Sequence, residues 1–70
     1  MEDKINIIGR NIKRIRIDNN MTQKYLACRL KIERPTLTHY EKGDRVPSID
    51  ILWNIADIFD ISIDELVGRK

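Results

Sequence analysis

Apolar residues recur at helical spacing over the first part of the chain. Four isoleucines lie at i, i+3, i+7 and i+10, which is one face of an α-helix: Ile5, Ile8, Ile12 and Ile15. This spacing predicts a helix over residues 5–18. Asn19 and Asn20 are expected to end that helix, because asparagine tolerates the left-handed conformation. Ile17 lies off the stripe, and we expect it to fold under the helix end.

Two short amphipathic segments follow, joined by a turn that contains Ile32. Their apolar stripes share the spacing of a helix face: Leu26, Ala27 and Leu30 in the first, Leu37 and Tyr40 in the second. Thr22 is a suitable N-cap for a helix over residues 22–30. Pro35 is tolerated in a first turn and marks the start of a helix over residues 34–42. Gly43 is expected to end this helix.

Two further helices are predicted in the last third of the chain. Ser48 caps a helix over residues 48–59 with a wide apolar face: Ile49, Leu52, Trp53, Ile55, Ala56 and Phe59. We expect Trp53 to lie in the core rather than in an interface. Ser62 and Glu65 form a capping box that opens a helix over residues 62–67. No segment has a strand pattern, so the predicted fold class is all-α, with five helices around one core.

Polar side chains lie between the apolar positions of residues 34–42, where they would point outward: Arg34, Thr36, Thr38 and His39. This is the layout of a helix-turn-helix, in which one helix braces a second that lies in the major groove of DNA. Residues 1–47 carry 11 Lys/Arg against 6 Asp/Glu, whereas residues 48–70 carry 2 against 5. The uneven charge indicates one face for an anionic partner, with a mixed solvated surface as the alternative.

Length and composition limit the number of domains, the location and the chemistry expected of this chain. The chain has 70 residues, 41% hydrophobic and 34% charged, and is expected to fold as one small domain over residues 1–70. A single cysteine, Cys28, and no signal-like apolar start fit a cytoplasmic protein, and no apolar run is long enough for a membrane span. With one histidine, no paired carboxylates and no glycine-rich phosphate loop, we expect no enzyme, no cofactor and no metal site.

Taken together, these motifs resemble the lambdoid repressor and Cro helix-turn-helix family, also called XRE-family regulators. The residues that carry the resemblance are Met21-Thr22-Gln23, Leu26-Ala27, Leu30, Ile32, Thr36, Leu37, Tyr40-Glu41-Lys42-Gly43, Pro47-Ser48, Ile55-Ala56 and Ser62-Ile63-Asp64-Glu65-Leu66. It covers about residues 8–67 and implies a five-helix DNA-binding domain that acts as a dimer on a two-fold symmetric operator. Three positions depart from the family's helix-end preferences: Lys31 and Asp60 replace a frequent glycine, and Glu33 replaces the usual Ser or Thr cap.

Four residues are predicted to contact bases: Arg34, Pro35, Thr38 and His39. The Arg34 guanidinium suits O6 and N7 of guanine, with a phosphate contact or a solvated arginine as the alternative. His39 would donate to a guanine or a phosphate. Thr38 would meet a thymine methyl or an exocyclic group, and Pro35 a thymine methyl. Many family members carry a polar base-reading residue at the position of Pro35, so one hydrogen-bonding position is lost here.

A second set is predicted to position the DNA backbone: Lys13, Thr22, Gln23, Thr36, Lys42, Gly43 and Arg45. Such contacts orient a protein without reading sequence. The family resemblance implies that Gln23 bonds a phosphate and braces the recognition helix. It also implies a structural ion pair between Arg16 and Glu41, which would hold helix 34–42 against the first helix.

A third set is expected at a dimer interface, with scattered surface apolar residues as the alternative: Ile51, Ile63 and Val67. The chain is therefore predicted to be a sequence-specific regulator of transcription, a dimeric repressor or controller protein that binds an inverted repeat in double-stranded DNA. Two alternatives involve an unidentified protein partner. One is a DNA-binding, antitoxin-like protein, and the other is a helical adaptor for protein interactions.

Overall fold

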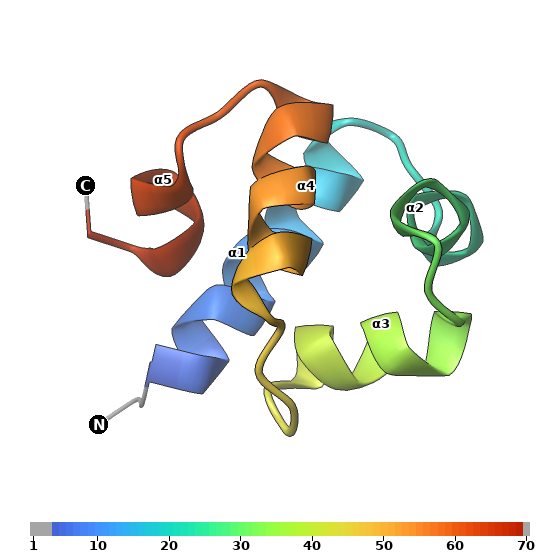
Figure 1. Cartoon of the computed structure of the whole chain (residues 1–70), viewed down its shortest axis with the longest axis horizontal. Helices are drawn as coiled ribbons and strands as arrows, with labels where there is room; N and C mark the ends of the chain where they lie inside the picture. The colour runs from blue at the N-terminus through green and yellow to red at the C-terminus, as the bar shows by residue number, and fades with distance from the viewer. Residues whose placement is uncertain (1–3, 70) are drawn as a thin grey trace.

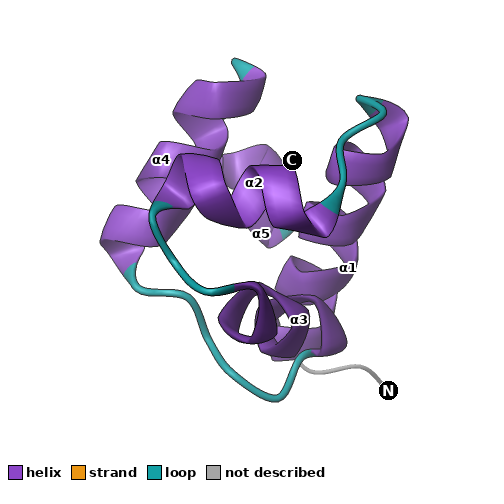
Figure 2. Cartoon of the chain, turned by 90° about the vertical axis from the view of Figure 1, so that its right-hand side faces the viewer, coloured by secondary structure: helices purple, strands orange, loops and turns teal. Residues whose placement is uncertain are grey.

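Five α-helices make up the fold (Figures 1 and 2). The computed structural model describes residues 4–69 and the side chains of residues 7–69, so the side chain of Ile5 lies outside the described residues. In chain order the helices are α1 (Lys4–Asp18), α2 (Gln23–Leu30), α3 (Arg34–Lys42), α4 (Ile49–Phe59) and α5 (Ile63–Val67). The described residues contain no strand, and the predicted all-α class is confirmed. None of these helices combines the length and apolar character needed to cross a bilayer.

Local capping chemistry explains where the helices begin. The Thr22 hydroxyl oxygen accepts the backbone N–H of Tyr25 at 3.0 Å, and Ser48 caps α4 in the same way. Ser62 and Glu65 form the expected capping box at α5. Each such cap contributes about 1 kcal/mol by giving a partner to an N–H that the helix cannot satisfy. For this reason α2, α4 and α5 each begin one residue after the predicted start, which is the N-cap itself.

Left-handed residues end the helices. Gly43 closes α3 with a φ of 87°. Asn20, Lys31 and Asp60 adopt φ values of 56°, 59° and 55°. A non-glycine residue in this conformation costs about 1 kcal/mol because its Cβ crowds the next carbonyl oxygen. Glu33, at the N-cap of α3, makes no side-chain capping bond. The departures at Lys31, Glu33 and Asp60 thus weaken helix ends without changing the fold.

Each helix contributes a fully buried residue to a single core. These residues are Ile12 from α1, Leu26 from α2, Leu37 from α3, Ile55 from α4 and Leu66 from α5, each with 0% of its surface exposed. Burial of one such side chain contributes about 1.5–3 kcal/mol. The core therefore depends on all five helices at once, and it holds α3 by its buried face.

A glycine lets α1 and α3 approach each other closely. A Cβ built on Gly9 would lie 2.4 Å from the carbonyl oxygen of Tyr40 and 2.8 Å from that of Glu41. Both are backbone atoms, so a side chain at this position would force the two helices apart. The close crossing seats the C-terminal half of α3 directly on α1.

Two expectations about apolar residues are wrong. Trp53 is 60% exposed and does not lie in the core, and Ile17 is 52% exposed rather than folded under α1. Ile49 is also exposed. The reason at α4 is geometric. Only the stripe through Leu52 and Ile55 faces the other helices, and successive helical residues point about 100° apart, which turns Trp53 out of that stripe.

Candidate nucleic-acid interface

The solvent side of α3 gathers the residues predicted to read bases. Five side chains line one shallow depression of about 350 Å³: Arg34, Pro35, Thr38, His39 and Lys42. They follow one another at the spacing of a single helix face, while Leu37, Tyr40 and Glu41 face inward and are buried. In Figure 2 this helix lies at the lower front of the molecule, below α2. The depression thus presents two cations, an imidazole, a threonine and a proline ring on one face of the helix.

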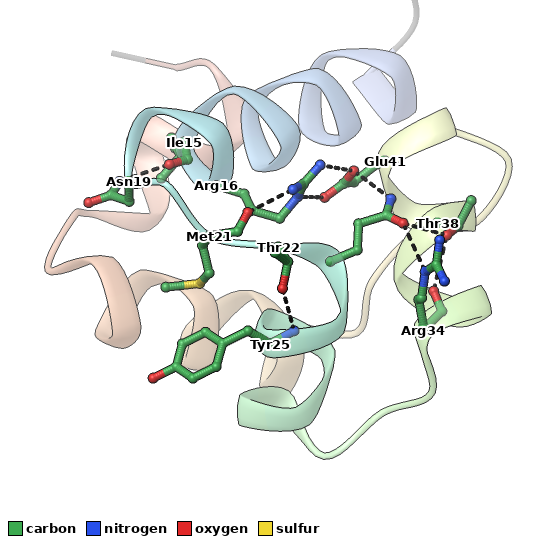
Figure 3. Close-up of polar contacts among 10 residues, drawn as sticks. Ile15, Arg16, Asn19, Met21, Thr22, Tyr25, Arg34, Thr38 and Glu41 are labelled. Atoms are coloured by element: carbon green, nitrogen blue, oxygen red, sulfur yellow. Dashed lines mark hydrogen bonds and ion pairs between the residues drawn. The ribbon is translucent and has the colours of Figure 1, made fainter.

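An ion pair joins α1 to α3 beneath this face (Figure 3). Arg16 Nε donates to Glu41 Oε2 at 2.7 Å and Arg16 Nη2 donates to Glu41 Oε1 at 3.2 Å. Arg16 Nη1 donates to the Met21 carbonyl oxygen at 2.8 Å. The two side chains are only 11% and 3% exposed. The two-bond geometry fixes the relative orientation of the two helices.

Gln23 connects this ion pair to the exposed face of α3. Its amide Nε2 donates to Glu41 Oε1 at 3.0 Å. Its Oε1 accepts from the Thr38 hydroxyl at 3.2 Å and from Arg34 Nε at 3.4 Å. A carboxylate only accepts hydrogen bonds, so the amide nitrogen must face Glu41 and the amide oxygen must face the other two residues. The first residue of α2 therefore braces both the buried and the exposed side of α3.

These contacts limit the hydrogen bonds that Thr38 can make with a base. Its side chain is half-buried, and its hydroxyl lies within hydrogen-bond distance of Gln23 Oε1 and of the Arg34 carbonyl oxygen, at 3.2 and 3.1 Å. The one hydroxyl hydrogen is used within the protein, so Thr38 can offer a base its methyl group or the lone pairs of its hydroxyl oxygen without breaking an existing bond. Thr36 is half-buried and does not line the depression.

A contact that the sequence did not suggest lies at the end of α3. His39 Nδ1 is 3.2 Å from Asp44 Oδ2, and the two side chains are 47% and 54% exposed. The hydrogen bond from His39 lowers the pKa of the Asp44 carboxyl below its usual value of 3.8, and Lys42 adds a smaller effect in the same direction. No role was predicted for Asp44 from the sequence. An acid directly after the glycine that ends a helix is the one signal that would have identified it.

The residues predicted to position the DNA backbone occupy three places. Lys42, Gly43 and Arg45 lie together at the end of α3 and in the loop that follows. Thr22 lies at the start of α2, where its oxygen accepts the capping bond and its own hydrogen remains to donate. Lys13 lies apart from the α3 depression and lines a second one on α1, of about 460 Å³.

The residues predicted for a dimer interface do not stand out as exposed. Ile51, Ile63 and Val67 are half-buried and pack against the core. Trp53, which was not among them, is far more exposed and lines a depression of about 200 Å³ together with Ile63 and Ile61. Sequence spacing missed Trp53 because it placed this residue on the core side of α4.

Two further observations concern metal and thiol chemistry. Within the described part of the chain, His, Cys, Asp and Glu side chains nowhere gather in a group of three that could hold a metal ion. Cys28 is exposed on α2, off the apolar stripe that Leu26, Ala27 and Leu30 form.

Comparison with known proteins identifies the family. The helix-turn-helix family model matches residues 12–66, which span all five helices except the first turns of α1 and the last residue of α5. The chain belongs to this family, and the resemblance to lambdoid repressor and Cro (XRE) regulators is confirmed.

Two curated relatives illustrate the match. The chain is 39% identical over 61 residues to the uncharacterized HTH-type transcriptional regulator YqaE of Bacillus subtilis, covering 87% of this chain and 53% of that protein. It is 42% identical over 50 residues to the cryptic phage CTXphi transcriptional repressor RstR of Vibrio cholerae, covering 71% of this chain and 45% of that protein. The chain spans about half the length of these two relatives.

A solved structure shares the fold. The restriction-modification controller protein C.AhdI from Aeromonas hydrophila superimposes with a TM-score of 0.81 at 24% identity, covering 89% of this chain and 94% of that chain. At this identity the likeness supports the five-helix architecture and no more.

Proposed function

We propose that this chain is a sequence-specific, DNA-binding regulator of transcription that inserts α3 into the major groove. The observation that carries the proposal is the braced face of α3. Its base-reading candidates share one depression, and a hydrogen-bond network that reaches a buried ion pair holds the helix behind them. Preorganised side chains lose less conformational entropy when they bind. The names of YqaE and RstR, a regulator and a repressor, agree with this role.

Within this proposal, Arg34 reads a guanine. Gln23 already holds its Nε, which leaves the terminal nitrogens of the guanidinium for O6 and N7. Pro35 and Thr38 offer apolar contact to thymine methyl groups. Gln23 would also contact the DNA backbone. One of its Nε2 hydrogens is donated to Glu41, and the second remains to be donated to a phosphate.

The phosphate contacts come from the ends of α2 and α3. Lys42 and Arg45 supply charge, and Thr22 and the Gly43 backbone supply neutral hydrogen bonds. Lys13 would contribute charge from the flank of α1. Each phosphate that a cation neutralises should add about 0.9 to the slope of log affinity against log salt. The proposal includes a cytoplasmic location, because its ligand is the cell's own DNA, and it assigns no catalytic role.

The proposal also includes a homodimer, formed through α4 and α5. Trp53 supports it, because a large exposed aromatic side chain beside other apolar groups is typical of protein interfaces. Ile63 would share the contact, with Ile51 and Val67 at its edge. Two copies related by a two-fold axis would place their α3 helices about 34 Å apart, one turn of B-DNA. Sedimentation of the unmodified chain and of Trp53→Ala tests this. A dimer weakened by the substitution supports the interface, and a monomer at every concentration contradicts it.

Selection of random DNA duplexes by the purified chain tests the function directly. Enrichment of an inverted repeat with half-site centres about 10–11 base pairs apart is the expected result. Binding to all duplexes alike, with a steep salt dependence and no enrichment, would contradict the proposal. That result would favour the two alternatives, an antitoxin-like protein or a helical adaptor.

A matched pair of substitutions tests the residue roles. Arg34→Ala should cost about 1–3 kcal/mol and relax specificity at one base pair. Lys42→Ala should weaken binding to all sequences about equally and lower the salt slope by about 1. If Arg34→Ala behaves as Lys42→Ala does, Arg34 is a phosphate ligand and the assignment to guanine is wrong.

A further inference from the structure

The last turn of α3 holds an acidic side chain against the chain's single histidine. Gly43, with a φ of 87°, turns the backbone so that the Asp44 N–H donates to the His39 carbonyl oxygen at 3.2 Å. The same turn brings Asp44 Oδ2 to 3.2 Å from His39 Nδ1. Two hydrogen bonds, one from the backbone and one between side chains, thus join the same two residues. The carboxylate is placed by the helix end itself and not by a free loop.

The Asp44 carboxylate determines which ring nitrogen of neutral His39 carries the hydrogen. The pKa of the Asp44 carboxyl is lowered by this hydrogen bond, so the group is ionised at neutral pH. An ionised carboxylate only accepts, and therefore His39 Nδ1 must donate. A neutral imidazole has one N–H in all. With that hydrogen on Nδ1, the other nitrogen, Nε2, has none and presents a lone pair.

His39 is also part of the proposed DNA-binding surface. It lines the same depression as Arg34 and Lys42, two side chains that only donate hydrogen bonds. Pro35 has no polar side-chain atom, and the Thr38 hydroxyl donates its hydrogen within the protein while its half-buried oxygen keeps its lone pairs. Besides the half-buried Thr38 hydroxyl oxygen, His39 Nε2 is the only side-chain acceptor that these five residues offer to a base.

We propose that Asp44 sets the tautomer of His39, so that Nε2 accepts a hydrogen bond from an exocyclic amino group, N6 of adenine or N4 of cytosine. These are the groups that donate in the major groove. The inference rests on the proposed function and deepens it, because it names the base class that His39 recognises. It replaces the expectation drawn from the sequence, in which His39 donates to a guanine or a phosphate. Asp44 is then a positioning residue for specificity that acts through the imidazole.

The tautomer can be measured without DNA. Because the chain has one histidine, its two ring nitrogens give the imidazole signals of a ¹⁵N-labelled sample without ambiguity. At a pH alkaline enough for the nitrogen shifts to show a neutral ring, the Nδ1–H tautomer should predominate. Asp44→Ala should move the population several-fold toward the Nε2–H tautomer. Asp44→Asn is the matched control, since it also removes the charge but keeps an oxygen that accepts from Nδ1–H. A predominant Nε2–H tautomer in the unmodified chain would overturn the inference.

The base preference is measured by selection of random duplexes with four chains: the unmodified protein, Asp44→Ala, His39→Ala and the double variant. The position that loses its preference in His39→Ala is the one that the imidazole reads, and it should be adenine or cytosine. Asp44→Ala should reduce that preference about 3- to 10-fold, the size of one hydrogen bond, and should leave the guanine read by Arg34 unchanged. In the His39→Ala background, Asp44→Ala should have no further effect at this position.

The outcomes separate this inference from the proposed function. Guanine at the position read by His39, or a preference that Asp44→Ala leaves unchanged, would overturn the inference while the regulator role stands. An Asp44→Ala effect that persists without the imidazole would show that Asp44 contacts the base itself, which also overturns it. If the unmodified chain enriches no sequence, the proposed function is overturned, and with it the proposed contact of His39 with a base. The tautomer measurement still reports on the Asp44 contact alone.

Discussion

Replacing Arg16 by methionine should leave a buried carboxylate without its counter-ion. The Glu41 side chain is 3% exposed, so water cannot replace the lost partner. The substitution removes the bonds of 2.7 and 3.2 Å to Glu41 and the bond of 2.8 Å to the Met21 carbonyl oxygen. Among the described residues, only the Gln23 amide, at 3.0 Å, remains as a side-chain partner of the carboxylate. Methionine keeps much of the aliphatic stem of arginine, so the change reports mainly on the charge.

The expected loss is large compared with the stability of so small a domain. Removing one partner of a buried ion pair costs about 3–5 kcal/mol. A chain of 70 residues has a free energy of unfolding of about 4–10 kcal/mol. The Arg16→Met chain should therefore unfold at a Tm at least about 12 °C lower than the unmodified chain. Changing Glu41 to leucine in the same chain removes the stranded charge, and it should recover at least about 2 kcal/mol.

Urea denaturation followed by far-ultraviolet circular dichroism measures these free energies. Arg14→Met is the matched control, because it makes the same change on the same helix. Arg14 lies 3.8 Å from Asp18, and their side chains are 60% and 64% exposed. An exposed pair contributes little, so this control should stay within about 0.5 kcal/mol of the unmodified chain. An Arg16→Met loss below about 1 kcal/mol, close to that of the control, would refute the reasoning from burial.

Three shorter predictions concern the helix ends and the α1–α3 crossing. Lys31→Gly should raise the free energy of unfolding by about 1 kcal/mol, because glycine adopts the observed φ of 59° without strain; a lower urea midpoint would contradict this. Gly9→Ala should lower the free energy of unfolding by about 1–3 kcal/mol, since its Cβ would lie 2.4 Å from the Tyr40 carbonyl oxygen; an unchanged midpoint would show that the helices separate freely. The pKa of Asp44 is lowered from 3.8 in the folded state, so its contribution is present above pH 3.8 and is lost as the pH falls through the lower folded value. Melting temperatures of the unmodified chain and Asp44→Asn should therefore converge in acid, and a gap that persists at about pH 2 would exclude this linkage.

The helices and their ends were predictable because the responsible interactions are local. Thr22, Ser48 and Ser62 act on N–H groups three residues away, and Gly43 and Asn20 need only their own φ. The period of the apolar stripes was a sound guide wherever a helix has a single buried face. These interactions span about one helical turn, so the order of residues is sufficient to identify them.

The position of Trp53 was not predictable in the same way. Apolar residues on several sides of α4 made its whole surface look suited to the core. Only the crossing of α4 with its neighbours selects Leu52 and Ile55 for burial and leaves Trp53 60% exposed. Gly9 is a similar case, since its importance comes from two carbonyl oxygens more than 30 positions later in the chain.

The residues of the proposed DNA-facing surface follow from their spacing along α3, and no long-range information is needed to group Arg34 with His39. What these groups can donate or accept depends on contacts from outside the helix. Gln23 of α2 holds the inner side of α3 through its hydrogen bond to Glu41, which is 18 positions later in the chain. The Asp44 carboxylate, across the glycine turn, places the hydrogen on one nitrogen of His39. Helical period is a property of neighbouring residues, whereas burial and the hydrogen bonds that Gln23 makes depend on distances that exist only once the helices have packed together.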